Sequence, residues 1–158
     1  MIDDIEAFMT ADHAQLDDLL KRADRADGTI DMTLYERFRS GLLRHIAMEE
    51  KVLIPFLREH FGGGPLPIAT ALRRDHGEIA KLLVPTPDAA LLDRLRQVLA
   101  LHNALEEGPD GLYAKCDTFA GDARHRLMTR LRAQPEVPVA KHYDGPLLHL
   151  DRERARSS

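Results

Sequence analysis

The sequence predicts an all-α protein, an up-down-up-down four-helix bundle with a short extra C-terminal helix and an extended tail. Three observations predict this fold. Apolar residues recur at steps of three and four along four long segments, which is typical of amphipathic helices. Short stretches rich in Gly and Pro separate these segments, as the connections of a bundle do. Aromatic residues make up only 5% of the chain and charged residues 30%, which favours helices over sheets.

The first two helices form the first half of the predicted bundle. The first is expected over residues 2–26 and ends at "DGT". The second is the most regular and ends near "HFGGGP", because a run of glycines breaks a helix. Its inward stripe consists of Tyr35, Phe38, Leu42, His45, Glu49, Val52 and Phe56.

The third and fourth helices repeat this arrangement. The third ends before "PTP", and the fourth begins behind Asp88, a typical capping residue. Their inward stripes are Ala69, Leu72, His76, Ile79 and Leu83, then Leu92, Leu95, Leu99, His102 and Glu106. Shorter helices follow through "LYAKCDTF" and "DARHRLMTRLRA". One domain over residues 1–132 and a tail rich in Pro and charge over residues 133–158 are therefore expected.

Composition excludes several classes of function. The net charge of −4 with neutral histidines argues against a nucleic acid or an anionic membrane as partner. The start "MIDDIEAFMT" does not resemble a signal peptide, and no stretch approaches the roughly 20 apolar residues of a membrane span. Cys116 is the only cysteine, which excludes an internal disulfide and a thiolate metal cluster. A cytoplasmic protein is expected.

Six ionisable side chains lie on the inward stripes of the four helices. A buried polar group without a partner costs about 2–7 kcal/mol, against a typical total stability of about 5–15 kcal/mol. A bound metal cation compensates directly, since imidazole and carboxylate are ligands that iron, manganese and zinc accept. A step of four residues also places a His and a Glu one turn apart on one helix face. The predicted ligands are His13, His45, Glu49, His76, His102 and Glu106.

An internal repeat strengthens this interpretation. "DHAQLDDLL" at residues 12–20 returns as "DHGEIAKLL" at residues 75–83, and each is followed by its own His-x3-Glu-Glu. The chain is thus read as two helical hairpins, each with two His and one Glu. Packed face to face, they would form a pocket for two metal ions bridged by two carboxylates.

The order His, His-x3-Glu, His, His-x3-Glu on four helices resembles the hemerythrin-like (HHE cation-binding) family over residues 8–120. "HIAMEEKVLIPFL" is similar to that family's second-helix signature. The resemblance implies a hemerythrin-like bundle with two non-haem iron ions and an oxo or hydroxo bridge. It implies the four His as terminal ligands and Glu49 and Glu106 as bridges, with no catalytic residues beyond these ligands.

The sequence departs from the oxygen-carrying hemerythrins at two positions. Ala80 stands where they have a further His, and His102-x3-Glu106 replaces their His-x4-Asp. Each iron would then have about five ligands, and an open position suits reaction with oxygen, peroxide or nitric oxide rather than oxygen carriage. The four-His arrangement is closer to the iron-sulfur-repair branch of the family.

Two functions follow from the resemblance. The first is binding or reaction with a small oxidant in oxidative or nitrosative stress. The alternative is an iron-sensing or iron-donating module that acts through a protein partner. Whether the protein is an enzyme is left open. Ferritin-like Glu-x-x-His and protease-type His-Glu-x-x-His motifs are absent, which argues against a ferritin-like oxidase and a zinc hydrolase.

Residues beside the ligands are expected to be peripheral. Sequence neighbours do not share a helix face, so Asp12 and Asp75 are predicted to be solvated surface acids. Glu50 and Glu107 are predicted at the surface, with a supporting or channel role as the alternative. Tyr143 is a candidate gate or additional ligand if the tail covers the bundle mouth; otherwise the tail is loosely attached. Cys116 is expected to pack in the core, and His60 and His125 are expected to be exposed.

Overall fold

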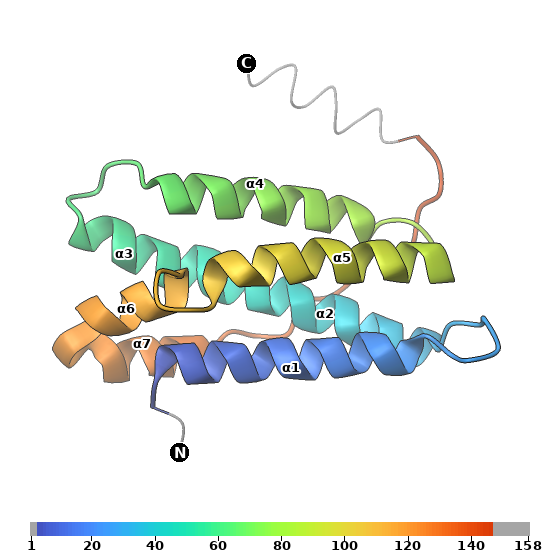
Figure 1. Cartoon of the computed structure of the whole chain (residues 1–158), viewed down its shortest axis with the longest axis horizontal. Helices are drawn as coiled ribbons and strands as arrows, with labels where there is room; N and C mark the ends of the chain where they lie inside the picture. Colours follow the sequence, from blue (N-terminus) through green and yellow to red (C-terminus); the bar gives the residue numbers. More distant parts are fainter. Residues whose placement is uncertain (1–2, 147–158) are drawn as a thin grey trace.

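The computed structural model describes residues 3–146, and this part of the chain is helical without a β-strand. Long helices lie side by side, and successive ones reverse direction along the molecule (Figure 1). The predicted all-α class is confirmed. None of the helices between residues 3 and 146 has both the length and the apolar character needed to cross a membrane. The elements are α1 (Ile5–Ala23), α2 (Met32–Met48), η1 (Glu49–Leu53), α3 (Ile54–His60), α4 (Pro67–Leu82), α5 (Ala89–Glu106), α6 (Leu112–Ala120), η2 (Gly121–Ala123) and α7 (Arg124–Arg132).

Aspartates begin three of the four long helices. The side chains of Asp4, Asp31 and Asp88 accept the N–H groups of the residue three positions on, at the starts of α1, α2 and α5. Each satisfies a backbone donor that the first helical turn leaves unpaired. The predicted cap at Asp88 is confirmed. Helix α4 instead begins with Pro67, whose missing N–H is not needed at that position.

The second long helix is less regular than its sequence pattern predicts. The π-helical turn η1 separates α2 from α3, whose second residue is Pro55. A proline inside a helix cannot donate to the carbonyl four residues before it, here that of Lys51. Arg130 supplies the missing donor, with Nη2 at 3.2 Å from that oxygen. The turn shifts the buried face, so Leu57 is buried and Phe56 only half-buried, contrary to the predicted stripe.

Two apolar clusters fill the interior, one towards each end of the long helices. Along α1, Met9 belongs to one cluster and Leu16 to the other, and His13 lies between them. Along α4 the same holds for Leu72, His76 and Ile79. The predicted ligands therefore form a polar layer between two apolar layers, which hold the helices around it.

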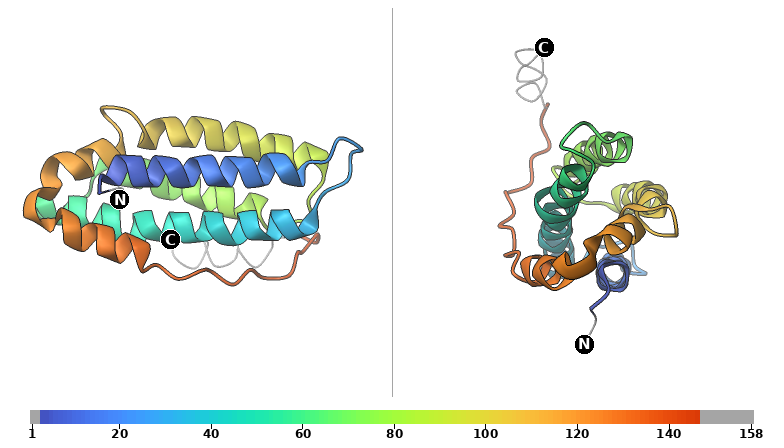
Figure 2. Two further views of the ribbon diagram at one scale, coloured as in Figure 1. Left: turned by 90° about the horizontal axis from the view of Figure 1, so that it is seen from below. Right: turned by 90° about the vertical axis from the view of Figure 1, so that its left-hand side faces the viewer.

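Helices α6 and α7 lie at the end of the molecule where α1 begins, and the chain then runs back along α2 (Figure 2). Ser40 Oγ donates to the carbonyl of Val137 at 2.8 Å, and Arg44 Nε to that of Gln134 at 2.7 Å. The tail is thus attached along α2 as far as His142, and Tyr143 and Asp144 then contact Val84 and Thr86 between α4 and α5, away from the ligand layer. The rest of the predicted tail, residues 147–158, lies outside the described residues.

Candidate metal centre

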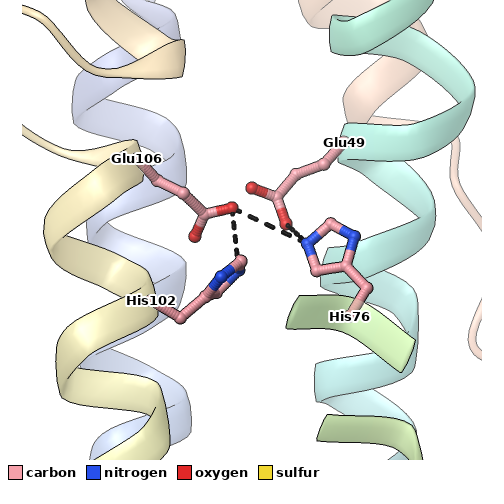
Figure 3. A group of neighbouring side chains, drawn as sticks. All are labelled: Glu49, His76, His102 and Glu106. Carbon is pink, nitrogen blue, oxygen red and sulfur yellow. Dashed lines mark ion pairs between the residues drawn. The ribbon is translucent and has the colours of Figure 1, made fainter. Parts of the chain in front are cut away.

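The structure brings all six predicted ligands together in one buried layer. Figure 3 shows four of them, contributed by α4, α5 and the first residue of η1, with their polar ends turned towards one another. Their donor atoms form two groups, each with all atoms within 4.8 Å of one another. The first group is Glu49, His76, His102 and Glu106, and the second is His13, His45 and Glu106.

The two carboxylates connect the two groups. Glu106 Oε2 lies 3.2 Å from His102 Nε2, and Glu106 Oε1 lies 3.2 Å from His13 Nε2. Glu49 Oε1 lies 3.3 Å from His76 Nε2 and 3.6 Å from His45 Nε2. Each carboxylate therefore faces a histidine from either half of the chain, as a bridging ligand must.

The donor set fits a metal because several of its buried atoms lack a hydrogen-bond partner. Glu49 Oε1, His76 Nε2 and both oxygens of Glu106 are buried without a hydrogen bond. The imidazole nitrogens near them are at ion-pair distance, but the geometry is not that of a hydrogen bond. Buried polar atoms almost always have partners, so this cluster needs an additional one. A cation such as iron, manganese or zinc would satisfy these nitrogen and oxygen atoms at once.

A ring of four further carboxylates surrounds the ligand layer. Each accepts the Nδ1–H of one histidine, at 2.6, 2.7, 3.1 and 3.2 Å, and so leaves Nε2 to face the centre. Such partners fix the orientation and tautomer of a metal-binding histidine. The pairs are His13 with Glu107, His45 with Asp12, His76 with Glu50 and His102 with Asp75.

The prediction that Asp12 and Asp75 are solvated surface acids is wrong. Each carboxylate contacts a histidine on a different helix, not the ligand beside it in the sequence. Asp12 therefore reaches His45 on α2, and Asp75 reaches His102 on α5. Glu50 and Glu107 are about two-fifths exposed, and their carboxylates contact His76 and His13, as the alternative of a supporting role requires.

Burial and neighbouring charges shift the pKa values of Glu49, His76 and His102 within the layer. Burial alone would raise the pKa of Glu49, but the charges of His45 and His76 outweigh burial and lower it. Burial would lower the pKa of His76, and its carboxylate partners Glu49 and Glu50 raise it instead. For His102 burial prevails and lowers the pKa. The ionised carboxylate of Glu49 and the neutral imidazole of His102 are thus favoured, which are the forms that bind a metal. The raised pKa of His76 means, by contrast, that this imidazole gives up its proton less readily when it binds one.

The hemerythrin HHE cation-binding domain is the known family whose model matches the chain, over residues 4–130. The chain belongs to this family. The matched residues contain all six predicted ligands, and the resemblance inferred from the sequence is confirmed. Comparison with curated proteins and with solved structures gives no match.

Tyr113 is a component of this hemerythrin-like centre that the sequence pattern does not reveal. It is fully buried on α6, and its hydroxyl donates to Glu49 Oε2 at 2.9 Å. Burial, followed by the charge of Glu49, raises its pKa well above the usual range, so the phenol is protonated. The only sequence signal is its place on the apolar face of a short helix, which equally predicts an ordinary core residue.

The remaining singled-out residues lie away from the centre. Tyr143 is exposed, with its N–H on the carbonyl of Val84 and its hydroxyl on that of Pro146, so the structure does not bring it to the ligands. Cys116 is buried in an apolar cluster, and His60 and His125 are exposed, as predicted. Ala80 is also exposed, while its neighbour Ile79 is buried.

Proposed function

We propose that this hemerythrin-like protein binds two non-haem iron ions and reacts with a small oxidant such as oxygen, peroxide or nitric oxide. In this proposal the four long helices act as an up-down-up-down bundle that carries the ligands. The observation that supports it most is the division of six buried donors into two groups that share Glu106. Two groups with a shared carboxylate suit two ions rather than one.

In this proposal the ligands, the ring of carboxylates and the apolar clusters have different roles. The four imidazole Nε2 atoms would hold the ions at their outer sides, and Glu49 and Glu106 would hold them together. Bound iron would supply the electrons for reduction of the oxidant. The ring of four carboxylates would keep the imidazoles oriented, and the apolar clusters on both sides would exclude water from the layer.

Small uncharged molecules have a route towards this layer. A cavity of about 300 Å³ between α1 and α5 extends to His13 and Glu107. Its apolar lining includes Leu16, Leu20 and Phe38. Oxygen and nitric oxide are apolar enough to enter such a cavity, whereas a charged substrate would lose its hydration there.

Reaction is favoured over reversible oxygen carriage. The exposed Ala80 supplies no ligand, so α4 contributes only His76 to the layer. The reduced protein should therefore be oxidised by oxygen rather than form a long-lived adduct. Repeated binding and release of oxygen without oxidation would contradict this part of the proposal.

Metal content tests the proposal first. Protein purified without added metal should contain about two irons per chain by mass spectrometry. His45→Ala and Glu106→Ala should each lose iron and unfold at lower temperature, whereas His60→Ala, which alters an exposed histidine, should keep both properties. Stoichiometric zinc from iron-replete cells, or full iron content in both ligand variants, would overturn the proposal.

An iron-sensing role is the second candidate, and the unpartnered buried atoms favour it. Since Glu106 has no other partner for its oxygens, loss of metal should loosen the bundle. A protein partner that binds only the metal-loaded or only the loosened form would make the protein an iron sensor or donor. Rapid oxidation by oxygen, peroxide or nitric oxide supports the first candidate; inertness to all three, with metal-dependent protease resistance, supports the second.

A further inference from the structure

Tyr113 lies where the second donor group is incomplete. The group around His76 and His102 has four members, whereas the group around His13 and His45 has three. The Tyr113 hydroxyl oxygen lies 3.0 Å from His45 Nε2, 3.1 Å from His13 Nε2 and 2.9 Å from Glu49 Oε2. It therefore lies at nearly equal distances from both histidines of the smaller group and from the carboxylate of Glu49.

These distances match those between ligands of one metal. Metal–ligand bonds of about 2.1 Å at right angles place neighbouring donor atoms about 3.0 Å apart. The three distances from Tyr113 agree with that spacing, and so does the 3.2 Å between His13 Nε2 and Glu106 Oε1. The oxygen is thus spaced from these donors as a further ligand of the same ion would be.

We propose that the phenol oxygen of Tyr113 is a ligand of the iron held by His13 and His45. This inference rests on the proposed di-iron function. Without metal the phenol is protonated and donates to Glu49; on binding iron(III) the O–H bond breaks, the oxygen joins the ion and the proton leaves to solvent. No tyrosine hydroxyl contacts His76 or His102 within residues 3–146, so the two irons would be inequivalent.

An anionic phenolate would favour iron(III) over iron(II) at that position, because it stabilises the higher charge. This preference suits a centre that is oxidised in its reaction and opposes reversible oxygen carriage. The consequence is visible, since iron(III) phenolates absorb visible light by charge transfer from the ring to the metal.

The experiment compares iron(III)-loaded wild-type protein with Tyr113→Phe and Tyr35→Phe. Tyr35 is also fully buried, but its hydroxyl has no hydrogen-bond partner and it lies in the apolar cluster away from α6. Wild type and Tyr35→Phe should show the charge-transfer band with resonance-enhanced tyrosine ring vibrations, and Tyr113→Phe should lack both. Iron loading of Tyr113→Phe should also release one proton fewer.

A further variant, compared with wild-type protein, keeps the outcome decisive if Tyr113→Phe does not fold. The chain has three tyrosines, so the double variant Tyr35→Phe/Tyr143→Phe retains Tyr113 alone and should keep the band. Wild-type protein that binds iron without the band, or a band lost in the double variant, would overturn the role of Tyr113 only. Wild-type protein that binds no iron would overturn the di-iron function itself.

Discussion

His45 Nδ1 lies 2.7 Å from Asp12 Oδ2, although Asp12 belongs to another helix and directly precedes a different ligand, His13. The same displacement recurs around the centre, where four carboxylates, each next in sequence to a ligand, support the histidine of another helix. The ring closes with Glu107, which returns from α5 to His13 on α1. Because each supporting contact joins two helices, the ring couples the orientation of the ligands to the packing of the bundle.

Asp12→Asn should weaken metal binding without unfolding the protein. An amide oxygen still accepts the Nδ1–H of His45 but carries no charge, so the imidazole becomes a poorer donor. Loss of such a partner typically lowers metal affinity about 10–100-fold. Competition with a coloured chelator measures the change, and Asp18→Asn, on the exposed face of the same helix, is the matched control. Equal affinities for the two variants would show that Asp12 does not tune the site.

Glu106→Met should separate the stability of the bundle from its metal binding. Glu106 is fully buried, and both its oxygens lack a hydrogen-bond partner. Replacement of this unpartnered carboxyl by an apolar side chain of similar volume removes the cost of burying it, so the free energy of unfolding of the metal-free protein is expected to rise by about 1–3 kcal/mol. Metal content should fall at the same time.

Urea unfolding of chelator-treated protein and mass spectrometry test the two effects separately. Glu78→Met alters an exposed carboxylate on α4 and should change neither. A metal-free Glu106→Met protein less stable than metal-free wild type would mean that the carboxylate stabilises the bundle by itself.

The sequence pattern predicts the ligand layer well because helical periodicity decides which side chains face inward. All six predicted ligands are buried, and the two hairpins of the repeat contribute to the two donor groups. The residue type at Asp88 also predicts the start of α5, because a helix cap is a local interaction between residues close in sequence.

The helical pattern does not predict which residues of different helices contact one another. Asp12 is off the inward stripe of α1, and only the closeness of α2 brings it to His45. The shift of the buried face after η1 depends on Pro55 and on Arg130 of a distant helix. Tyr113 joins the centre only because α6, which continues beyond the end of α5, packs against α1 and α3. Each of these features depends on the angle and distance between helices, which a single helical stripe does not contain.

Gly111→Ala should disturb the centre from outside it. A Cβ atom at Gly111 would lie 2.2 Å from the carbonyl oxygen of Glu106, the last residue of α5. The clash is with backbone and is therefore not relieved by a side-chain rotation. We expect a loss of about 1–3 kcal/mol of stability and weaker iron binding, because Glu106 and Tyr113 flank this turn.

Thermal unfolding and metal analysis test this expectation. Gly64→Ala is the matched control, since its Cβ would meet no atom within 4 Å. A Gly111→Ala protein with the melting temperature and iron content of wild type would show that the turn can move without disturbing the ligands.

Cys116 should stay unmodified in the folded protein. It is fully buried, and burial raises the pKa of its thiol to about 12, so almost no thiolate exists at neutral pH. Since the thiolate is the reactive form, iodoacetamide should not alkylate it until the protein unfolds. Mass spectrometry before and after addition of guanidinium tests this, and rapid alkylation of the native protein would indicate that the α6 end opens frequently.

His142→Ala should loosen the end of the tail segment on α2 while iron content stays unchanged. His142 contacts Glu36 on α2 and the carbonyl of Pro85, so it holds the segment through two contacts.

Burial alone would raise the pKa of Glu36, but hydrogen bonds from His142 and Arg39 outweigh burial and lower it. The stabilising contribution of Glu36 is thus present above its ordinary pKa and is lost only as the pH falls through the lowered value. At neutral pH, limited proteolysis within residues 134–146 should be faster in His142→Ala than in the control His125→Ala. Iron lost together with the tail would show instead that this segment supports the metal centre.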